Sequence, residues 1–233
     1  MGPKTARPVG IAILASLRCI GRNGTVPCDL NGPGFSDAPA FESEVEDKVA
    51  ATSNPIDLGS QAPDFELPDG NGHPIRLRGK AGSAGTLVIF ICNHCPYVLH
   101  MRDALQRYAQ DYASRGIGVI AINPNDPVAY PQESPEHVAE VARHLAFPYL
   151  IDTDQKVARA YNAACTPDPY LYDAQLRLYY HGQFDATRPG ITPATGADLR
   201  QATERLLAAK PALAAQAASI GCSIKWKPGS EPR

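Results

Sequence analysis

The sequence has no apolar run long enough to cross a bilayer and no excess of charge of one sign. Its 22 Lys and Arg nearly balance its 24 Asp and Glu, so the formal net charge at pH 7 is -2. A basic surface for nucleic acid or for an anionic membrane is therefore not expected. With 233 residues, of which 44% are hydrophobic, the chain is long enough to bury a core of its own.

Cysteine is also scarce, with six residues that are too few and too unevenly spaced to frame a small disulfide-stapled scaffold. Only Cys92 and Cys95 have an informative spacing. A CxxC pair is either a redox dithiol or half of a zinc site. Because a structural zinc site takes a second pair of ligands at similarly short spacing, and the sequence has none, the pair favours redox chemistry. The six cysteines are Cys19, Cys28, Cys92, Cys95, Cys165 and Cys222.

Residues 1–57 are rich in proline and glycine, which predicts a poorly ordered N-terminal extension. The apolar run at residues 9–17 follows Lys4 and Arg7, as in a signal peptide, but Arg18 closes it and no convincing cleavage pattern follows. A cytoplasmic location is therefore expected. Export remains an alternative, and so does a translation start placed too early in the reading frame.

An ordered domain is expected over residues 58–229. Its first elements form a β-hairpin from residues 62–67 and 75–77, joined by a Pro-Asp-Gly turn. Buried strands and helices then alternate, which predicts an α/β protein with a largely parallel sheet and an antiparallel edge. The expected strands cover residues 86–91, 117–123, 149–151, 170–172 and 176–180. The expected helices begin at Pro96, Ser134, Asp154 and Thr195.

Cys92 follows the strand at residues 86–91, and it is expected to lie in the first turn of the next helix. Free backbone N–H groups and the positive end of the helix dipole stabilise a thiolate at such a position, so Cys92 is the predicted nucleophile. Cys95 is placed to resolve the mixed disulfide that Cys92 forms with a substrate. His94 is expected to favour the thiolate and to move the couple in the oxidising direction, the alternative being a solvent-exposed helix residue.

Cys165, Thr166 and Pro167 precede the predicted terminal hairpin. In this chain order they resemble the cis-proline loop of the thioredoxin superfamily, in which the residue before the proline faces the CxxC pair. The resemblance implies that Thr166 offers its backbone to an extended substrate peptide as an additional strand. The alternative is an ordinary trans proline ahead of a strand.

Several segments together carry a wider resemblance, among them APDFELPDG, FICNHCPYV, AINPND, CTPDPYLYD and IGCSIKWKPG. They are similar to bacterial thioredoxin-like proteins of the redoxin group, often labelled as relatives of peroxiredoxins and thiol-specific antioxidant proteins (AhpC/TSA). The resemblance covers residues 58–229. It implies a thioredoxin fold, with a central mixed sheet flanked by helices and an N-terminal β-hairpin extension. It also implies a thiol-disulfide oxidoreductase without a cofactor, acting on a disulfide-containing protein or a small thiol.

Two departures from related patterns bear on the chemistry. The peroxiredoxin signature PxxxTxxC is missing, because Val88 to Ile91 lead into Cys92, so thiol peroxidase activity is the less favoured alternative. Many thioredoxins hold a buried carboxylate on this strand, and residues 86–91 contain none. Glu66, or solvent, is the candidate for that role.

Cys222 and Cys165 are possible secondary thiols, since the C-terminal GCSIKWK segment can fold back toward the proline loop. A disulfide between them and two separate buried thiols are the two alternatives. A third class of function is a copper-binding module on the same fold, with Cys92 and Cys95 as thiolate ligands. Its remaining ligand would come from His94, His100 or Cys222. The expectation from the spacing is that the site holds no metal.

Overall fold

The computed structural model describes residues 18–21, 24–27 and 50–231. The strands β1 (Arg18–Gly21) and β2 (Gly24–Pro27) form an antiparallel hairpin in a small unit of their own. Most of the predicted N-terminal extension lies outside the described residues. Its boundary at residue 58 stays a prediction.

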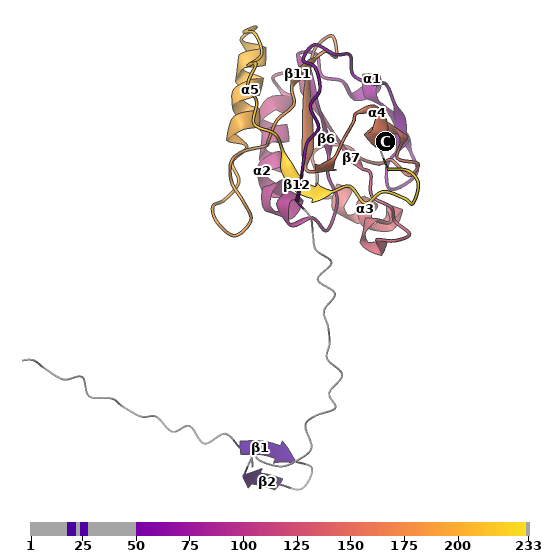
Figure 1. Ribbon diagram of the computed structural model, residues 1–233, viewed down its shortest axis with the longest axis vertical. Coiled ribbons are helices and arrows are strands. Elements are labelled where there is room, and N and C mark those ends of the chain that lie inside the picture. The colour runs from indigo at the N-terminus through magenta and orange to yellow at the C-terminus, as the bar shows by residue number, and fades with distance from the viewer. Residues whose placement is uncertain (1–17, 22–23, 28–49, 232–233) are drawn as a thin grey trace, which may run out of the picture. The chain divides into compact units, whose positions relative to one another are not determined.

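A five-stranded mixed sheet forms the centre of the larger unit, in the order β11-β10-β6-β7-β8 (Figure 1). The strand β6 is parallel to β7, and β7 is parallel to β8, whereas β10 runs antiparallel to both β6 and β11. This is the α/β arrangement that the alternating pattern predicts. The strands are β6 (Gly85–Phe90), β7 (Ile117–Asn123), β8 (Tyr149–Ile151), β10 (Asp168–Asp173) and β11 (Leu178–Tyr180).

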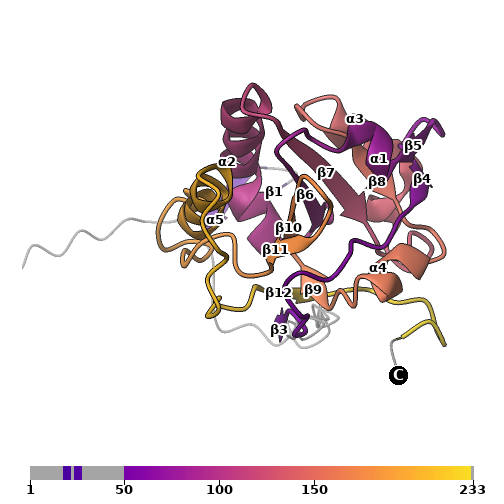
Figure 2. The same cartoon turned by 90° about the horizontal axis from the view of Figure 1, so that it is seen from above.

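The strand β6 is buried along its whole length because helices cover both faces of the sheet. Leu87 and Ile89 belong to one apolar cluster, and Val88 and Phe90 belong to another on the opposite face. Figure 2 shows α2 and α5 on one side of the sheet and α1 and α4 on the other. The helices are α1 (Leu77–Lys80), α2 (Pro96–Ala113), α3 (Pro135–Ala142), α4 (Lys156–Ala160) and α5 (Ala197–Leu207).

Two smaller sheets complete the larger unit. The predicted hairpin is present as β4 (Glu66–Pro68) and β5 (Pro74–Arg76), which pair antiparallel. The second sheet, in the order β3-β12-β9, was not predicted. It joins β3 (Ala50–Thr52), β12 (Ile220–Ser223) and β9 (Cys165–Thr166), and thereby brings the C-terminal segment beside the loop that contains Pro167.

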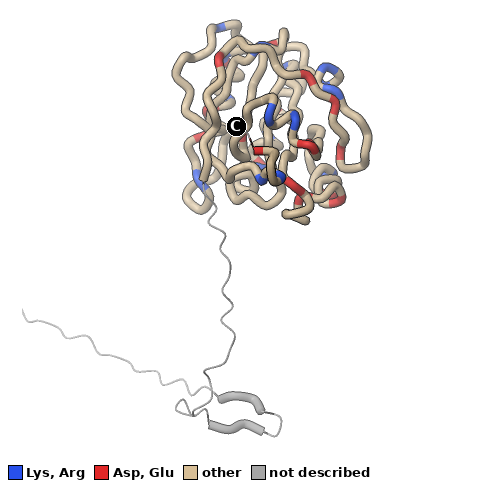
Figure 3. The backbone as a smooth tube through the Cα atoms, turned by 45° about the vertical axis from the view of Figure 1, so that its right-hand side comes forward, with Lys and Arg blue, Asp and Glu red and all other residues tan. Residues whose placement is uncertain are grey.

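Charged residues of both signs are interspersed along the chain, as Figure 3 shows. No helix among the described residues is long and apolar enough to cross a membrane.

Candidate active site

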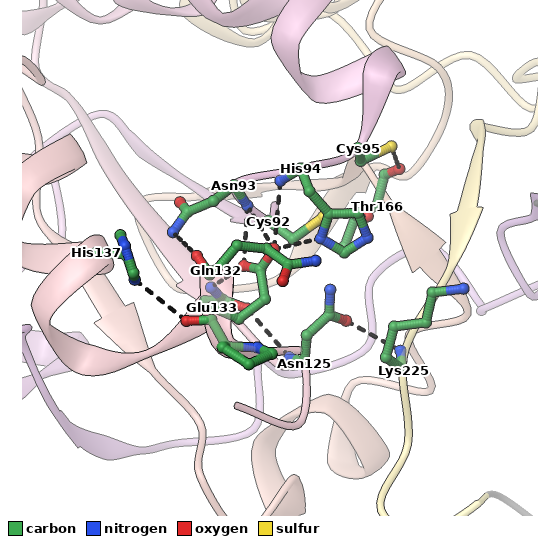
Figure 4. A network of polar contacts seen from close by, with 12 residues as sticks. Cys92, Asn93, His94, Cys95, Asn125, Gln132, Glu133, His137, Thr166 and Lys225 are labelled. Carbon is green, nitrogen blue, oxygen red and sulfur yellow. Dashed lines mark hydrogen bonds and ion pairs between the residues drawn. The ribbon is translucent and has the colours of Figure 1, made fainter. Parts of the chain in front are cut away.

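Cys92 and Cys95 lie in the short loop between the end of β6 and the start of α2 (Figure 4). Their side chains are buried, with 2% and 0% of the residue surface exposed. The helix begins at Pro96, and Cys95 is its N-cap. Proline suits the first helical position because its missing N–H would have no partner there. The prediction that Cys92 lies in the first helical turn is therefore wrong, since both cysteines precede that turn.

Thr166 contacts both sulfurs from the opposite side of the site. Its hydroxyl oxygen lies 3.2 Å from Cys92 Sγ, and its carbonyl oxygen accepts a hydrogen bond of 3.1 Å from Cys95 Sγ. The Thr166–Pro167 peptide bond is cis, as the resemblance to the proline loop implies. Thr166 follows Cys92 by 74 positions and Cys95 by 71 positions in the chain, and the pairing of β10 with β6 brings the three residues together.

The two thiols share a hydrogen bond, which raises the pKa of Cys92 and lowers the pKa of Cys95. With the proton on Cys92, this bond lowers the pKa of Cys95 to about 5. The contacts with Thr166 favour the opposite arrangement, because its carbonyl oxygen accepts a hydrogen bond from the Cys95 thiol and its hydroxyl lowers the pKa of Cys92. We therefore assign the negative charge of the singly protonated pair to Cys92.

Glu133 is a buried carboxylate next to the active-site loop, and it was not predicted from the sequence. It ends a single 3₁₀ turn (Pro131–Glu133) and accepts hydrogen bonds from the backbone N–H groups of Asn93, at 2.9 Å, and His94, at 3.2 Å. Asn123 on β7 donates another, at 2.6 Å. Burial raises the pKa of Glu133, but these hydrogen bonds together with one from His94 outweigh it, so the net shift is downward. The carboxylate is therefore charged at neutral pH.

His94 is held by Glu133 rather than exposed on a helix, so the alternative reading of this residue is wrong. Its Nδ1 hydrogen-bonds a Glu133 carboxylate oxygen, and its ring stacks on Tyr130 with 5.6 Å between ring centroids. Ligand atoms of Cys92, His94 and Glu133 all lie within 4.8 Å of one another. His94 is thus positioned beside the Cys92 sulfur, as its predicted tuning role requires.

The role suggested for Glu66 is contradicted by its position. Glu66 lies on β4, and its carboxylate is 45% exposed and pairs with Arg76 on β5 at 2.5 Å. A hairpin on the surface keeps this group in solvent. Glu133 is the carboxylate that reaches the cysteine pair.

The two further cysteines, Cys165 and Cys222, are buried near the site, and both are free thiols, as are Cys92 and Cys95. Cys222 pairs in register with Thr166, and Ser223 pairs with Cys165. The strand edge at Thr166, which the sequence leaves open to a substrate peptide, is therefore occupied by β12. His100, a suggested metal ligand, instead contacts the Thr187 hydroxyl at 2.9 Å.

A mixed sheet of this topology, with a cysteine pair at a strand-to-helix junction facing a cis-proline loop, defines a thioredoxin-fold protein with a dithiol site. The chain belongs to the AhpC/TSA family, whose model matches residues 58–181. The family match covers all of the site residues except Cys222.

Relatives that carry a functional name are similar to this chain over about half of its length. The thiol-disulfide oxidoreductase ResA of Geobacillus kaustophilus is 32% identical over 118 residues, which are 51% of this chain and 64% of that protein. The ResA of Bacillus subtilis is 25% identical over 130 residues, which are 56% of this chain and 69% of that protein. The chain thus spans less than two thirds of the length of the first of these relatives.

Two solved structures are similar over a larger share. A hypothetical protein from Sinorhizobium meliloti is 49% identical, with a TM-score of 0.74 over 76% of this chain and 99% of that chain. An uncharacterized conserved protein from Geobacillus kaustophilus is 47% identical, with a TM-score of 0.75 over 77% of this chain and 97% of that chain. Both support the fold described above.

Proposed function

We propose that this chain is a thiol-disulfide oxidoreductase in which Cys92 is the nucleophile and Cys95 the resolving thiol. The observation that carries the proposal is the pair of contacts through which Thr166 touches both sulfurs. The carbonyl holds the proton on Cys95 while the hydroxyl stabilises charge on Cys92. The ResA relatives are named thiol-disulfide oxidoreductases, which agrees with this chemistry.

In the reducing direction, the Cys92 thiolate attacks one sulfur of a substrate disulfide. A mixed disulfide forms, and the other substrate sulfur leaves as a thiolate. Cys95 then loses its proton and attacks the Cys92 sulfur, which releases the second substrate thiolate. The substrate gains two electrons, and the chain is left with a Cys92–Cys95 disulfide. The reverse sequence oxidises a substrate dithiol.

Glu133 and His94 act on this pair as positioning residues. Glu133 fixes the backbone of Asn93 and His94 and orients the His94 ring. Its negative charge raises the pKa of Cys92, after the larger effects of the Cys95 hydrogen bond and of burial. The charge on His94, when protonated, acts in the opposite direction. The two side chains are therefore expected to tune the potential of the couple in opposite directions.

Peroxidase activity is the less favoured alternative. Reduction of a peroxide needs hydrogen-bond donors for the leaving oxygen, and Ile89 stands where the peroxiredoxin signature has its threonine hydroxyl.

Insulin reduction by dithiothreitol tests the proposal. We expect the wild-type chain to catalyse it, and Cys92→Ser to abolish the catalysis. Cys95→Ser is expected to accumulate mixed disulfides with the substrate, which mass spectrometry identifies. Cys165→Ser is the matched control, because this buried thiol donates its hydrogen bond to the Pro167 carbonyl. Turnover that persists in Cys92→Ser would end the proposal.

A metal centre is a second candidate function, because Cys92, His94 and Glu133 offer three ligand atoms within 4.8 Å. Thiolate and imidazole suit Cu(I) or Zn²⁺. The hydrogen bonds that Glu133 already accepts compete with such a role. Metal analysis of protein purified under reducing conditions separates the candidates. One equivalent of metal that is lost in Glu133→Gln would favour the centre, and metal-free protein that reduces insulin would exclude it.

A further inference from the structure

The strand β12 brings a third thiol to the cysteine pair. Cys222 lies opposite Thr166 in the β12–β9 ladder, and residues paired in this way place their side chains on the same face, with Cβ atoms about 4.5–5.5 Å apart. On that face, the Thr166 hydroxyl contacts Cys92. Cys222 is 3% exposed and shares an apolar cluster with both active-site cysteines.

Cys222 lies close to Cys95. Both its thiol and its backbone N–H lie within hydrogen-bonding reach of the Cys95 sulfur. Cys95 also shares a hydrogen bond with Cys92. The Cys95 sulfur thus has two other thiols as neighbours, so that one sulfur can attack it while another leaves.

The position of Cys222 is fixed by close packing of β12 on the proline loop. A Cβ atom added to Gly221 would lie 2.1 Å from the Thr166 carbonyl oxygen, so only glycine permits this approach. The Ser219 hydroxyl donates a hydrogen bond of 2.7 Å to the Pro167 carbonyl. On the opposite edge, Cys222 pairs in register with Ala50 of β3.

We propose that Cys222 is a third redox-active thiol, which exchanges with the Cys92–Cys95 disulfide to form a Cys95–Cys222 disulfide. The proposal rests on the proposed function, which supplies the Cys92–Cys95 disulfide. Cys222 loses its proton, and its thiolate attacks Cys95 Sγ. The Cys95–Cys222 bond forms as the Cys92–Cys95 bond breaks, and Cys92 leaves as a thiolate that takes up the proton. No electrons enter or leave the chain in this step.

The exchange regenerates the nucleophile while the chain remains oxidised. Cys92 becomes a thiol again, and the disulfide now joins the N-cap of α2 to β12. This strand occupies the edge at Thr166, so the stored disulfide is shielded from a substrate peptide that would pair there. The third thiol thus separates the reacting cysteine from the disulfide that stores the oxidising equivalents.

Disulfide mapping of the full chain tests this inference. Reduced protein is oxidised with glutathione disulfide, quenched with acid, alkylated under denaturing conditions and digested for mass spectrometry. In the wild type we expect a Cys95–Cys222 linked peptide together with alkylated Cys92. Cys222→Ser is expected to lose both signals and to keep only the Cys92–Cys95 link. Cys165→Ser, the matched control, is expected to leave the pattern unchanged because its strand partner is Ser223.

The Cys92→Ser variant provides a second, independent readout, since it leaves Cys222 as the thiol in contact with Cys95. We expect it to form the Cys95–Cys222 disulfide. A wild-type protein with only the Cys92–Cys95 link, together with a Cys92→Ser variant without the Cys95–Cys222 link, would overturn the inference and leave the proposed function standing. If the wild type forms neither link and does not reduce insulin, the proposed function fails as well.

Discussion

Thr166 connects the two cysteines through different atoms of one residue, and these atoms act separately. The carbonyl oxygen accepts from Cys95, whereas the hydroxyl lies against Cys92 and lowers its pKa. A substitution that removes only the hydroxyl therefore leaves the Cys95 contact in place.

For Thr166→Val, which keeps the shape of the side chain, we expect the pKa of Cys92 to rise. The physical reason is that the thiolate loses a hydrogen-bond donor. Alkylation of Cys92 by iodoacetamide, followed against pH, measures this change. A midpoint that is unchanged, or that moves to lower pH, would contradict the role assigned to the hydroxyl.

For Glu133→Gln we expect the opposite shift, a fall in the pKa of Cys92. The amide keeps the size of the side chain and removes the negative charge beside the sulfur. The same alkylation profile reports the change, so the two variants form a pair with opposite predicted signs. Movement of both midpoints in one direction would refute the electrostatic account.

At the scale of single residues, the sequence predicted those site residues that belong to a recognisable motif. Cys92 and Cys95 were predicted from the CxxC spacing, and Pro167 from its place in the chain order. Glu133 was not, because it lies 39 residues beyond His94 and ends a single 3₁₀ turn. An acidic residue just ahead of a helix is common, and only tertiary folding brings this one to Asn93 and His94.

Among the strands and helices, β12 matters most for the arrangement of the site. It is the middle strand of a sheet that the local sequence pattern does not predict. The strands β7 and β8 match their predicted bounds because each is an apolar run buried on both faces. By contrast, β3 and β9 contain only three and two residues, and β12 contains four of mixed polarity. Such segments become strands because of their partners, and no periodicity marks them in advance.

Substitution of Gly221 tests how closely β12 must approach the proline loop. Gly221→Ala is expected to destabilise the protein by about 1–3 kcal/mol, because the new methyl group meets the Thr166 carbonyl. Urea denaturation measures the loss. Gly79→Ala is the control: this exposed glycine in α1 has open space around it, so alanine there is expected to be neutral or stabilising. Equal stability of the two variants would show that β12 is not tightly packed.

At the scale of the whole molecule, the boundary predicted at residue 58 separates β3 from the strand it pairs with. Ala50–Thr52 are paired with β12, so a chain that starts at residue 50 keeps the three-stranded sheet and one that starts at residue 58 loses an edge of it. We propose that the ordered domain requires β3.

Thermal unfolding of the two truncated chains checks this proposal. The chain from residue 50 is expected to unfold with the larger unit's full Tm. The chain from residue 58 is expected to unfold earlier, by roughly 2–4 °C for each kcal/mol of stability lost with β3. Identical Tm values for the two chains would instead favour the boundary predicted from composition.

The stability of the folded chain should also depend on Glu133 in acid. The pKa of Glu133 is lowered from 4.5 in the folded state, so its contribution is present above pH 4.5 and is lost as the pH falls through the lower folded value. Urea denaturation of wild type and Glu133→Gln between pH 7 and 3 isolates this contribution. The difference between the two proteins is expected to shrink in acid, and a constant difference would exclude the ionised carboxylate as its cause.

A redox titration in glutathione buffers, with alkylation and mass mapping of each cysteine, tests the central claim most directly. The account predicts that Cys95 loses its reactivity toward alkylation in a two-electron transition, and that Cys92 loses its reactivity together with Cys95 in Cys222→Ser. In Cys95→Ser, glutathione is instead expected to be trapped on Cys92. It would be contradicted if Cys92 and Cys95 both stayed alkylatable across the whole range of potentials while the protein still reduced insulin.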